Sequence, residues 1–440
     1  MERKGLAKVS LSLEAFFGNF YVAVSRGLFI PMLTYSGYPL DRVSTITFIA
    51  AVFNVVVSYL IYYNPRFMSR NTKAKLLLFH FMERIIWTSL PFTLYSPDLL
   101  TLFYGLAQVV TIPVGVLLNI AMLDVFKDEE FVEVNVLRSA VASAASLIGS
   151  LFTIYITALL TPPQSYYVAY VVSGLVGLLA SFSLIPYGMS KYFIEREGEK
   201  VPEEVEIRKV NTFLMLVLMM SGGNLLGLAW PQTLKLLGAP LYITIALNLA
   251  GNIGGILGPY LWRGYRSYVV AIAINTAFTA SIPLITVSYG HIVVSAILSA
   301  TFIGANLIAS SIYSKYVKSL GVVRASTFLT SSSAVGLLTA SLIGKYIPQN
   351  QFLIYGLAAF LKALALLVVL IAIPETAVVP VKTAYGYGKL IYTASVLGYT
   401  FTVETSFKIF KIFLQVLALT ALALLLLFIY GVVIILTSGV

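Results

Sequence analysis

The chain has 440 residues, of which 59% are apolar and only 11% are charged. A soluble globular protein is about half apolar and about a quarter charged, so this chain could not cover its surface in water. Its excess of 29 Lys and Arg over 18 Asp and Glu fits the cytoplasmic loops of a membrane protein, and a nucleic-acid-binding module is excluded. With no cysteine and only two histidines, disulfides, thiolate chemistry and the common zinc sites are excluded too.

Long apolar stretches, separated by turn and charge clusters, follow one another along the chain. A helix that crosses a bilayer needs about 20 mostly apolar residues, and windows of that size predict thirteen spans. They are residues 14–34, 43–63, 75–95, 99–123, 137–160, 166–188, 211–234, 241–262, 267–288, 292–313, 326–346, 352–373 and 412–436. No cleavable signal peptide is expected, because the first apolar stretch is long and contains Glu14 and Arg26.

The basic residues indicate how the chain is oriented in the membrane. With the N-terminus in the cytoplasm, only three of the 29 Lys and Arg lie outside, and three more lie within spans. The three outside are Arg42, Lys235 and Lys345. The three within spans are Arg26, Arg84 and Lys362. Because basic residues favour cytoplasmic loops, we predict a multi-pass protein of the cytoplasmic (plasma) membrane, with its N-terminus inside and its C-terminus outside.

The most polar connection before the tail divides the first twelve spans into two sets of six. Residues 189–210 carry runs of Glu, Arg and Lys and follow the sixth span. Two similar halves are typical of secondary transporters. We therefore predict an N-terminal half over 1–188, a cytoplasmic linker over 189–210 and a C-terminal half over 211–374.

Short segments at matching places in the two halves resemble one another. Residues 258–266, after the eighth span, are similar to residues 65–70, after the second. The fifth and eleventh spans each begin with one arginine, Arg138 or Arg324, followed by small residues. Small residues let helix backbones approach closely, so these helices are predicted to pack tightly or to rock against their neighbours.

These echoes resemble the loop motifs of the major facilitator superfamily over about residues 10–375. The family motif has a glycine, three residues, aspartate-arginine, and then a glycine with further basic residues. The matching positions are Gly258, Arg263, Gly264 and Arg266 in the second half, and Arg66 and Arg70 in the first. Trp262 and Pro65 occupy the aspartate position. The resemblance implies an all-α fold of two six-helix halves, alternating access, and gating roles for Arg66, Arg70, Gly258, Arg263 and Arg266.

Two cations within the spans are candidates for substrate binding. A charge at the bilayer centre costs from about 3 kcal/mol upward, so it is rarely left without a partner or a polar cavity. Arg26 lies in the middle of the first span and Lys362 in the middle of the twelfth. Both facing one cavity would suit an anionic substrate, although repulsion argues that at least one is paired. Glu83 is the candidate partner.

The third span carries His80 next to the dipeptide Glu83-Arg84. His80 shares a helix face with either residue, whereas Glu83 and Arg84 point about 100° apart. A buried carboxylate beside an imidazole could relay protons, which makes Glu83 and His80 candidates for coupling. The alternative is that this turn, about 12 Å from Lys75, reaches the cytoplasmic interface, and Glu14 is expected to be interfacial too.

Neutral polar residues within the spans fit a cavity between the halves, or hydrogen bonds between helices. Gln108, Asn224 and Asn252 are our candidates for substrate contacts. Pro231 frees a backbone carbonyl in the seventh span and permits a kink there. The glycines of 251–258 are interpreted as close helix packing, or alternatively as a hinge.

The tail departs from the twelve-span pattern. Residues 375–411 are rich in Tyr and Thr and are interpreted as a polar and aromatic connector, either a hairpin turning at Leu397-Gly398 or an interfacial segment. Residues 412–436 are almost purely aliphatic, which predicts a peripheral thirteenth span within 412–440. It is a docking helix for a membrane-protein partner or a simple anchor.

Two functions remain open from the sequence. The first is a secondary transporter that moves a small solute by alternating access, with proton coupling as one option. The second is a transporter-like structural subunit of a larger membrane complex, docked through 412–436. No phosphate-binding loop, catalytic triad or metal cluster is evident, so neither an enzyme nor a cofactor is expected.

Overall fold

The structure is a computed structural model that describes residues 2–126, 128–189, 203–313, 321–347 and 350–403. Every regular element in these ranges is a helix. The first half contains α1 (Glu2–Tyr35), α2 (Leu40–Tyr63), α3 (Pro65–Ser69), α4 (Thr72–Ser89), η1 (Leu90–Thr93), α5 (Pro97–Val125), α6 (Asp128–Leu159) and α7 (Gln164–Ser183). The second contains α8 (Glu203–Leu236), α9 (Leu241–Leu261), α10 (Tyr265–Ser281), η2 (Ile282–Leu284), α11 (Ser288–Tyr313), α13 (Val322–Tyr346) and α14 (Gln351–Ala372), followed by α15 (Val381–Val403).

Eleven of the described helices are long and apolar enough to cross a membrane, which confirms a multi-pass membrane protein. The predicted span 75–95 coincides with α4 and η1 but does not meet that test, because α4 carries Lys73, Lys75, Glu83 and Arg84. Instead, α4 packs against α5 and α7 inside the first half. The thirteenth predicted span, 412–436, lies outside the described residues.

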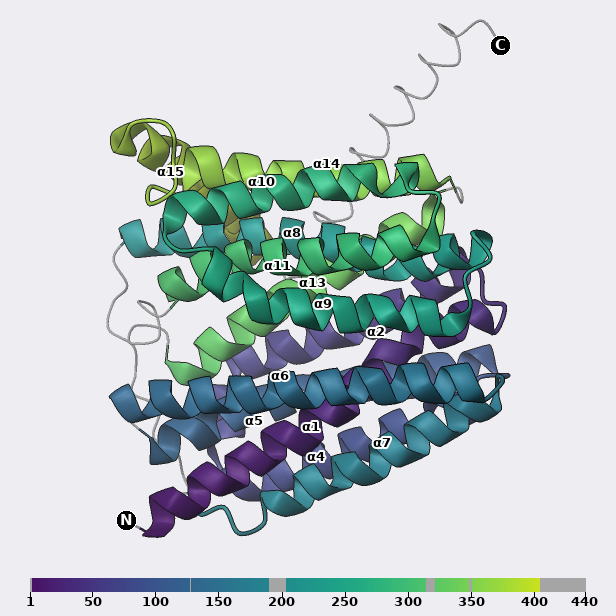
Figure 1. Cartoon of the computed structure of the whole chain (residues 1–440). Helices are drawn as coiled ribbons and strands as arrows, with labels where there is room; N and C mark the ends of the chain where they lie inside the picture. The colour runs from purple at the N-terminus through teal and green to yellow at the C-terminus, as the bar shows by residue number, and fades with distance from the viewer. Residues whose placement is uncertain (1, 127, 190–202, 314–320, 348–349, 404–440) are drawn as a thin grey trace, which may run out of the picture.

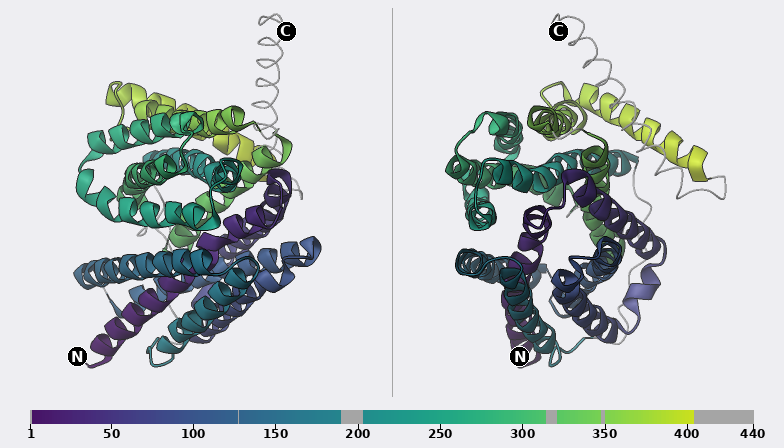
Figure 2. Two further views of the ribbon diagram at one scale, coloured as in Figure 1. Left: turned by 45° about the vertical axis from the view of Figure 1, so that its right-hand side comes forward. Right: turned by 90° about the vertical axis from the view of Figure 1, so that its right-hand side faces the viewer.

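The two halves form two bundles that face each other (Figures 1 and 2). In Figure 1 the purple and blue helices of the first half lie mostly below the green helices of the second. Contacts between the halves are made by α2 with α13, by α6 with α9, and by α1 with α8 and α9. Large apolar side chains such as Leu60, Leu102, Leu175 and Leu367 remain exposed, as expected for surfaces that face lipid rather than water.

The turns that join α1 to α2 and α8 to α9 are built in the same way. Gly37 and Gly238 adopt left-handed backbone angles (φ of +96° and +73°), which glycine reaches without steric cost. Pro39 and Pro240 then precede the next helix in extended conformation. Proline suits this place because its fixed φ is compatible with the turn and a helix start needs no N–H there. The turns after the first helix of each half are therefore built alike.

The glycines of 251–258 serve close packing of α9 against α11, as the packing interpretation predicted. A Cβ atom on Gly254 would collide with the carbonyl oxygen of Ala296, and one on Gly258 would lie 2.7 Å from that of Ala300. Gly251 instead faces Ser295 Oγ at 3.6 Å, an ordinary contact distance. Only part of the glycine run is thus required to be free of side chains.

We expect Gly254→Ala to lower the free energy of unfolding by about 1–3 kcal/mol, because the added methyl forces α9 and α11 apart. Gly251→Ala is the matched control and should cost much less, since its Cβ meets no atom closer than ordinary contact. Thermal unfolding of both variants in the same detergent measures the difference. Equal melting temperatures for the two variants would contradict the packing account.

The two ends of the second half differ from the sequence prediction. Residues 203–210, assigned to the linker, form the first turns of α8, where Glu203, Glu204 and Glu206 suit the positive end of the helix dipole. The hairpin interpretation of the tail is wrong, because Val381–Val403 is the helix α15. It packs on α8 and α14 at the outer side of the second half (Figure 2). The helix passes through Leu397-Gly398, where the turn was expected.

Candidate functional site

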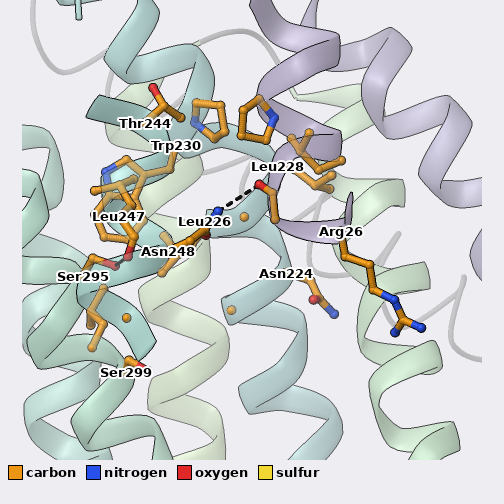
Figure 3. Close-up of a pocket in the computed structure, with 18 of the residues that line it drawn as sticks. Arg26, Asn224, Leu226, Leu228, Trp230, Thr244, Leu247, Asn248, Ser295 and Ser299 are labelled. Atoms are coloured by element: carbon orange, nitrogen blue, oxygen red, sulfur yellow. Dashed lines mark hydrogen bonds between the residues drawn. The ribbon is translucent and has the colours of Figure 1, made fainter. Parts of the chain in front are cut away.

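A cavity of about 670 Å³ lies between the two halves. It is lined by residues of α1, α2, α5 and α6 on one side and of α8, α9, α10, α11, α13 and α14 on the other. Four predicted substrate-contact residues line this cavity: Arg26, Asn224, Asn252 and Lys362. Figure 3 shows the side chains of Arg26 on α1 and Asn224 on α8 near each other in the cavity lining. The volume is that of a small-molecule pocket.

Gln108, the fifth predicted contact residue, is not brought to the cavity. Its side-chain oxygen accepts a hydrogen bond of 2.8 Å from Asn54 Nδ2, so this pair joins α5 to α2 within the first half. The ring of Tyr104, one turn before Gln108 on α5, lines the cavity in its place.

Arg26 is paired as the sequence predicted. Its Nη2 donates to Glu83 Oε1, and Arg84 Nη1 donates to Glu83 Oε2 at 2.5 Å. Thr111 Oγ1 adds a third donor to the same carboxylate at 3.1 Å. The Arg26 side chain is still 35% exposed, whereas that of Glu83 is 1% exposed. Arg26 therefore borders the cavity, with Glu83 behind it as its counter-ion.

The pairing of Glu83 with Arg84 differs from the helix-face expectation. Adjacent residues point in different directions, but the long arginine side chain bends back to reach its neighbour. Arg84 Cζ also lies 4.3 Å from the centre of the Tyr21 ring, a favourable cation–π arrangement. The guanidinium is held between α4 and α1.

A second carboxylate extends these contacts into a buried charge cluster, formed by Glu14, Arg26, His80, Glu83, Arg84 and Arg138. Arg138 Nη2 donates to Glu14 Oε2 at 2.5 Å, and His80 Nε2 lies 3.5 Å from Glu14 Oε1. His80 Nε2 is also 3.1 Å from Arg84 Nη2, which links the two carboxylates. Side chains from α1, α4 and α6 thus form one connected set of charge contacts inside the first half.

Burial of this cluster overturns the interfacial prediction for the third span and for Glu14. The residues Glu14, His80, Glu83 and Arg84 are between 0% and 4% exposed. Their side chains are enclosed by neighbouring helices rather than extended to the surface, because each has a partner of opposite or complementary charge inside the first half. Their position in the sequence suggested that these side chains extend to the interface, but contacts with other helices keep them buried.

Lys362 has a different environment in the second half. It is 1% exposed, and its Nζ donates a hydrogen bond of 2.7 Å to Thr279 Oγ1 on α10. No ion pair involves Lys362 among the described residues. Its stem packs on Gly222 of α8, where a Cβ atom would lie 2.8 Å from Lys362 Cγ. The glycine therefore provides the space for the lysine.

Asparagine side chains tie the two halves together along the cavity. Asn252 Nδ2 donates to Ser150 Oγ at 3.0 Å, which joins α9 to α6. Asn248 Nδ2 donates to the carbonyl oxygen of Gly27 at 2.8 Å, which joins α9 to α1 (Figure 3). Asn224 Nδ2 is buried without a hydrogen-bond partner among the described residues. Unlike the Nδ2 atoms of Asn248 and Asn252, Asn224 Nδ2 therefore remains available to donate a hydrogen bond to a bound solute.

The halves are closed against each other at the end where α1 leads into α2. Tyr35 Oη donates to the carbonyl oxygen of Ala239 at 2.6 Å, and Gln232 Nε2 donates to that of Tyr38 at 2.8 Å. Lys235 Nζ donates to the carbonyl oxygen of Thr34 at 2.8 Å. The predicted topology assigns this end to the outside, and the contacts of Tyr35, Gln232 and Lys235 are called the outer closure below.

The predicted gating loops lie at the opposite helix ends. Arg66, Arg70, Arg263 and Arg266 are exposed, and Gly258 is buried against α11. Trp262, at the position of the family's aspartate, donates from Nε1 to the carbonyl oxygen of Ala300 at 2.8 Å. Asn71 and Gly264 both have positive φ as N-caps, of α4 and α10, but their ψ angles differ (41° and 158°). The first loop also contains the short helix α3, so the two loops share a position in their halves but not a backbone conformation.

Two features of the site were missed from the sequence. Asn248 was grouped with the other neutral polar residues, yet it contacts the opposite half directly. Pro31 lies inside α1 and lines the cavity, as Pro231 does in α8. Both prolines lie shortly before the matching glycine turns, a spacing that is readable in the sequence. Among the described residues, no group of three or more His, Asp or Glu could hold a metal ion.

Comparison with known proteins relates this architecture to transporters. No protein-family profile matches the chain, and no curated protein sequence matches it either. Among solved structures, a bacterial homologue of the iron transporter ferroportin, in an inward-facing state, matches with a TM-score of 0.61 and 12% identity, covering 82% of this chain and 97% of that one. A structure from a study of proton-dependent oligopeptide transporters matches with a TM-score of 0.56 and 12% identity, covering 89% and 98%.

A point mutant of the nucleoside transporter NupG matches with a TM-score of 0.55 and 11% identity, covering 82% of this chain and 98% of that one. Such identities are too low to transfer a substrate, but the matches span nearly the whole of each neighbour. The chain therefore has the two-bundle, all-α fold of major-facilitator-type transporters that its loop motifs predicted.

Proposed function

We propose that the protein is a secondary transporter that carries a small polar solute across the membrane through the cavity between its halves. The observation that carries this proposal is a cavity of about 670 Å³ at the interface of the halves, bordered by charged and amide side chains. Transporters built from two halves bind their substrates at that interface, near the bilayer midplane. Arg26, Asn224 and Lys362 are the proposed substrate contacts.

Alternating access requires that the two halves close at one end while they open at the other. The outer closure at Tyr35, Gln232 and Lys235 supports a state closed on the predicted outer side. These are polar contacts between neighbouring backbones and side chains, which can be broken and re-formed at modest cost. We propose that outward opening breaks them.

Coupling is proposed at Glu83. Its carboxylate pairs with Arg26 on the cavity side and with Arg84 within the buried charge cluster. A change in one ion pair therefore alters the charge available to the other. His80 contacts Arg84 and adds a titratable group to the same cluster. A proton on Glu83 would release Arg26, which is how we propose that solute and proton binding are linked.

The alternative of a structural subunit depends on residues 412–436, which lie outside the described residues. A structural role alone does not require a polar cavity between the halves. The cavity therefore favours transport as the primary proposal.

Membrane vesicles from cells that overproduce the protein provide the test. Vesicles are incubated with a total small-molecule extract, and their contents are compared by mass spectrometry with those of vesicles carrying Arg26→Gln. We expect one or a few solutes to be enriched by the wild type and not by the variant. Indistinguishable contents at matched protein levels, in vesicles of both orientations, would refute transport through this site.

A further inference from the structure

Two buried hydrogen-bond donors on residues that line the cavity have no partner among the described residues: Arg26 Nε and Asn224 Nδ2. Lys362 Nζ carries up to three N–H bonds, and its hydrogen bond among the described residues goes to Thr279. One buried acceptor of the lining, Asn275 Oδ1, one turn from Thr279 on α10, is also without a partner there. No Asp or Glu is found among the described residues that line the cavity.

The two cations of the cavity differ in how they are neutralised. Arg26 has Glu83 as its counter-ion. The helices that pack against α14 near Lys362 offer no such group. α10 carries no carboxylate, and the carboxylates of α8 are all in its first turn, at Glu203, Glu204 and Glu206. Glu206 lies 16 residues before Gly222, which is about 24 Å along a helix.

The remaining neighbours of α14 provide no carboxylate for Lys362 either. The described helix α15 contributes Lys382 and Lys389 but no carboxylate. Glu375, beyond the end of α14, is paired with Arg208 at 2.9 Å. A buried ammonium without a counter-ion is costly, and it is stabilised by an opposite charge that arrives from outside the protein. The position of Lys362 at the cavity wall gives such a charge a route to it.

We propose that the cavity binds an anionic solute and that Lys362 supplies its counter-charge, with Asn224 and Arg26 donating hydrogen bonds to the same solute. This inference rests on the proposed transport function and defines its substrate class. A solute that bridges α1 and α14 would attract both halves, so occupancy would favour closing of the cavity. Gly222 supports the site by leaving room for the Lys362 stem between α8 and α14.

The native chain has no cysteine, which permits a direct test of the charge inside the cavity. A single cysteine is introduced as Asn224→Cys in the full-length protein in nanodiscs. Its rates of reaction are measured with anionic sulfonatoethyl methanethiosulfonate and with cationic trimethylammonioethyl methanethiosulfonate. Both are divided by the rate with neutral methyl methanethiosulfonate, which accounts for access and intrinsic reactivity. If Asn224→Cys reacts with none of the three, Ser299→Cys on α11 is the second position.

We expect the anionic reagent to react about tenfold faster than the cationic one, because a cavity lined by one sign of charge concentrates the opposite ion. Lys362→Met keeps the length of the side chain without its charge and should lower this ratio severalfold. Lys345→Gln, which removes a lysine at the far end of α13 near Tyr346, is the matched control and should leave the ratio unchanged.

A ratio near one in the protein that keeps Lys362 would overturn the proposal, and so would an anion preference that survives Lys362→Met. Neither result depends on transport, because the reagents report the cavity alone. The vesicle experiment, in turn, detects transport of a solute of any charge. The failure of the anion proposal and the failure of the transport proposal are therefore distinguishable.

Discussion

Replacing Glu83 with leucine is expected to lower the free energy of unfolding by about 3–5 kcal/mol, the usual cost of removing one partner from a buried ion pair. Glu83 is 1% exposed and forms ion pairs with both Arg84 and Arg26. The largest part of the loss should come from Arg84, whose side chain is 4% exposed and has no alternative carboxylate within 4 Å among the described residues. Thermal unfolding in detergent measures the effect.

Glu130→Gln is the control for this prediction. Glu130 pairs with Lys4 at 2.7 Å, but the two side chains are 48% and 55% exposed. Exposed pairs contribute about 0–1 kcal/mol, so the variant should unfold almost as the wild type does. If Glu83→Leu were no less stable than Glu130→Gln, the buried charge cluster would not hold α1 and α4 together as described.

Replacing either cavity cation is expected to reduce transport of the solute identified in vesicles by about tenfold or more, because a hydrogen bond to a charged group contributes about 1.5–3 kcal/mol. Arg26→Gln and Lys362→Met are the variants, and initial rates over a range of solute concentrations are the measurement. Lys345→Gln should transport as the wild type does.

Removal of Arg26 also leaves Glu83 with one cation fewer, so the single variant changes two things at once. Comparison of the double variant Arg26→Gln/Glu83→Gln with Glu83→Gln alone, at matched protein levels, separates them. If Arg26 acts on the solute, the double variant transports more slowly than Glu83→Gln. Equal rates would assign Arg26 only the task of neutralising Glu83.

Much of the fold could be predicted from the sequence, because span length and polar breaks are local properties. The runs at 211–234 and 352–373 coincide with the membrane-crossing part of α8 and with α14. Arg26 and Lys362 could be identified as candidates because a charge in the middle of an apolar span is costly unless it has a partner or a polar cavity. Whether both face one cavity was open from the sequence, and the structure has both residues in the lining of the same cavity.

The environment of each charge could not be predicted in the same way. Glu14 is neutralised by Arg138 and Arg26 by Glu83, across many residues of sequence and between different helices. Depth along one helix placed Glu83 and His80 near the interface, but neighbouring helices provide partners that keep them buried. Similarly, Tyr and Thr in 375–411 suggested a hairpin as one interpretation, whereas Val381–Val403 is a helix that packs on α8 and α14.

One repeat could have been read from the sequence and was not. Gly37-Tyr38-Pro39-Leu40 and Gly238-Ala239-Pro240-Leu241 have the same pattern at matching places in the two halves. Pro31 and Pro231 precede them at nearly equal distances. This repeated pattern lies at the outer closure and beside the cavity wall. The loop motifs lie at the other end of the helices and give no information about either.

Uptake into proteoliposomes tests most directly whether the cavity carries an anionic solute. Purified wild type and the Arg26→Gln/Lys362→Met double variant are reconstituted at equal density and supplied with the solute found in vesicles, its labelled form added outside. We expect saturable uptake of an anion by the wild type and its loss in the double variant. Equal saturable uptake by both proteins, or uptake confined to a neutral or cationic solute, would contradict transport of an anion through this cavity.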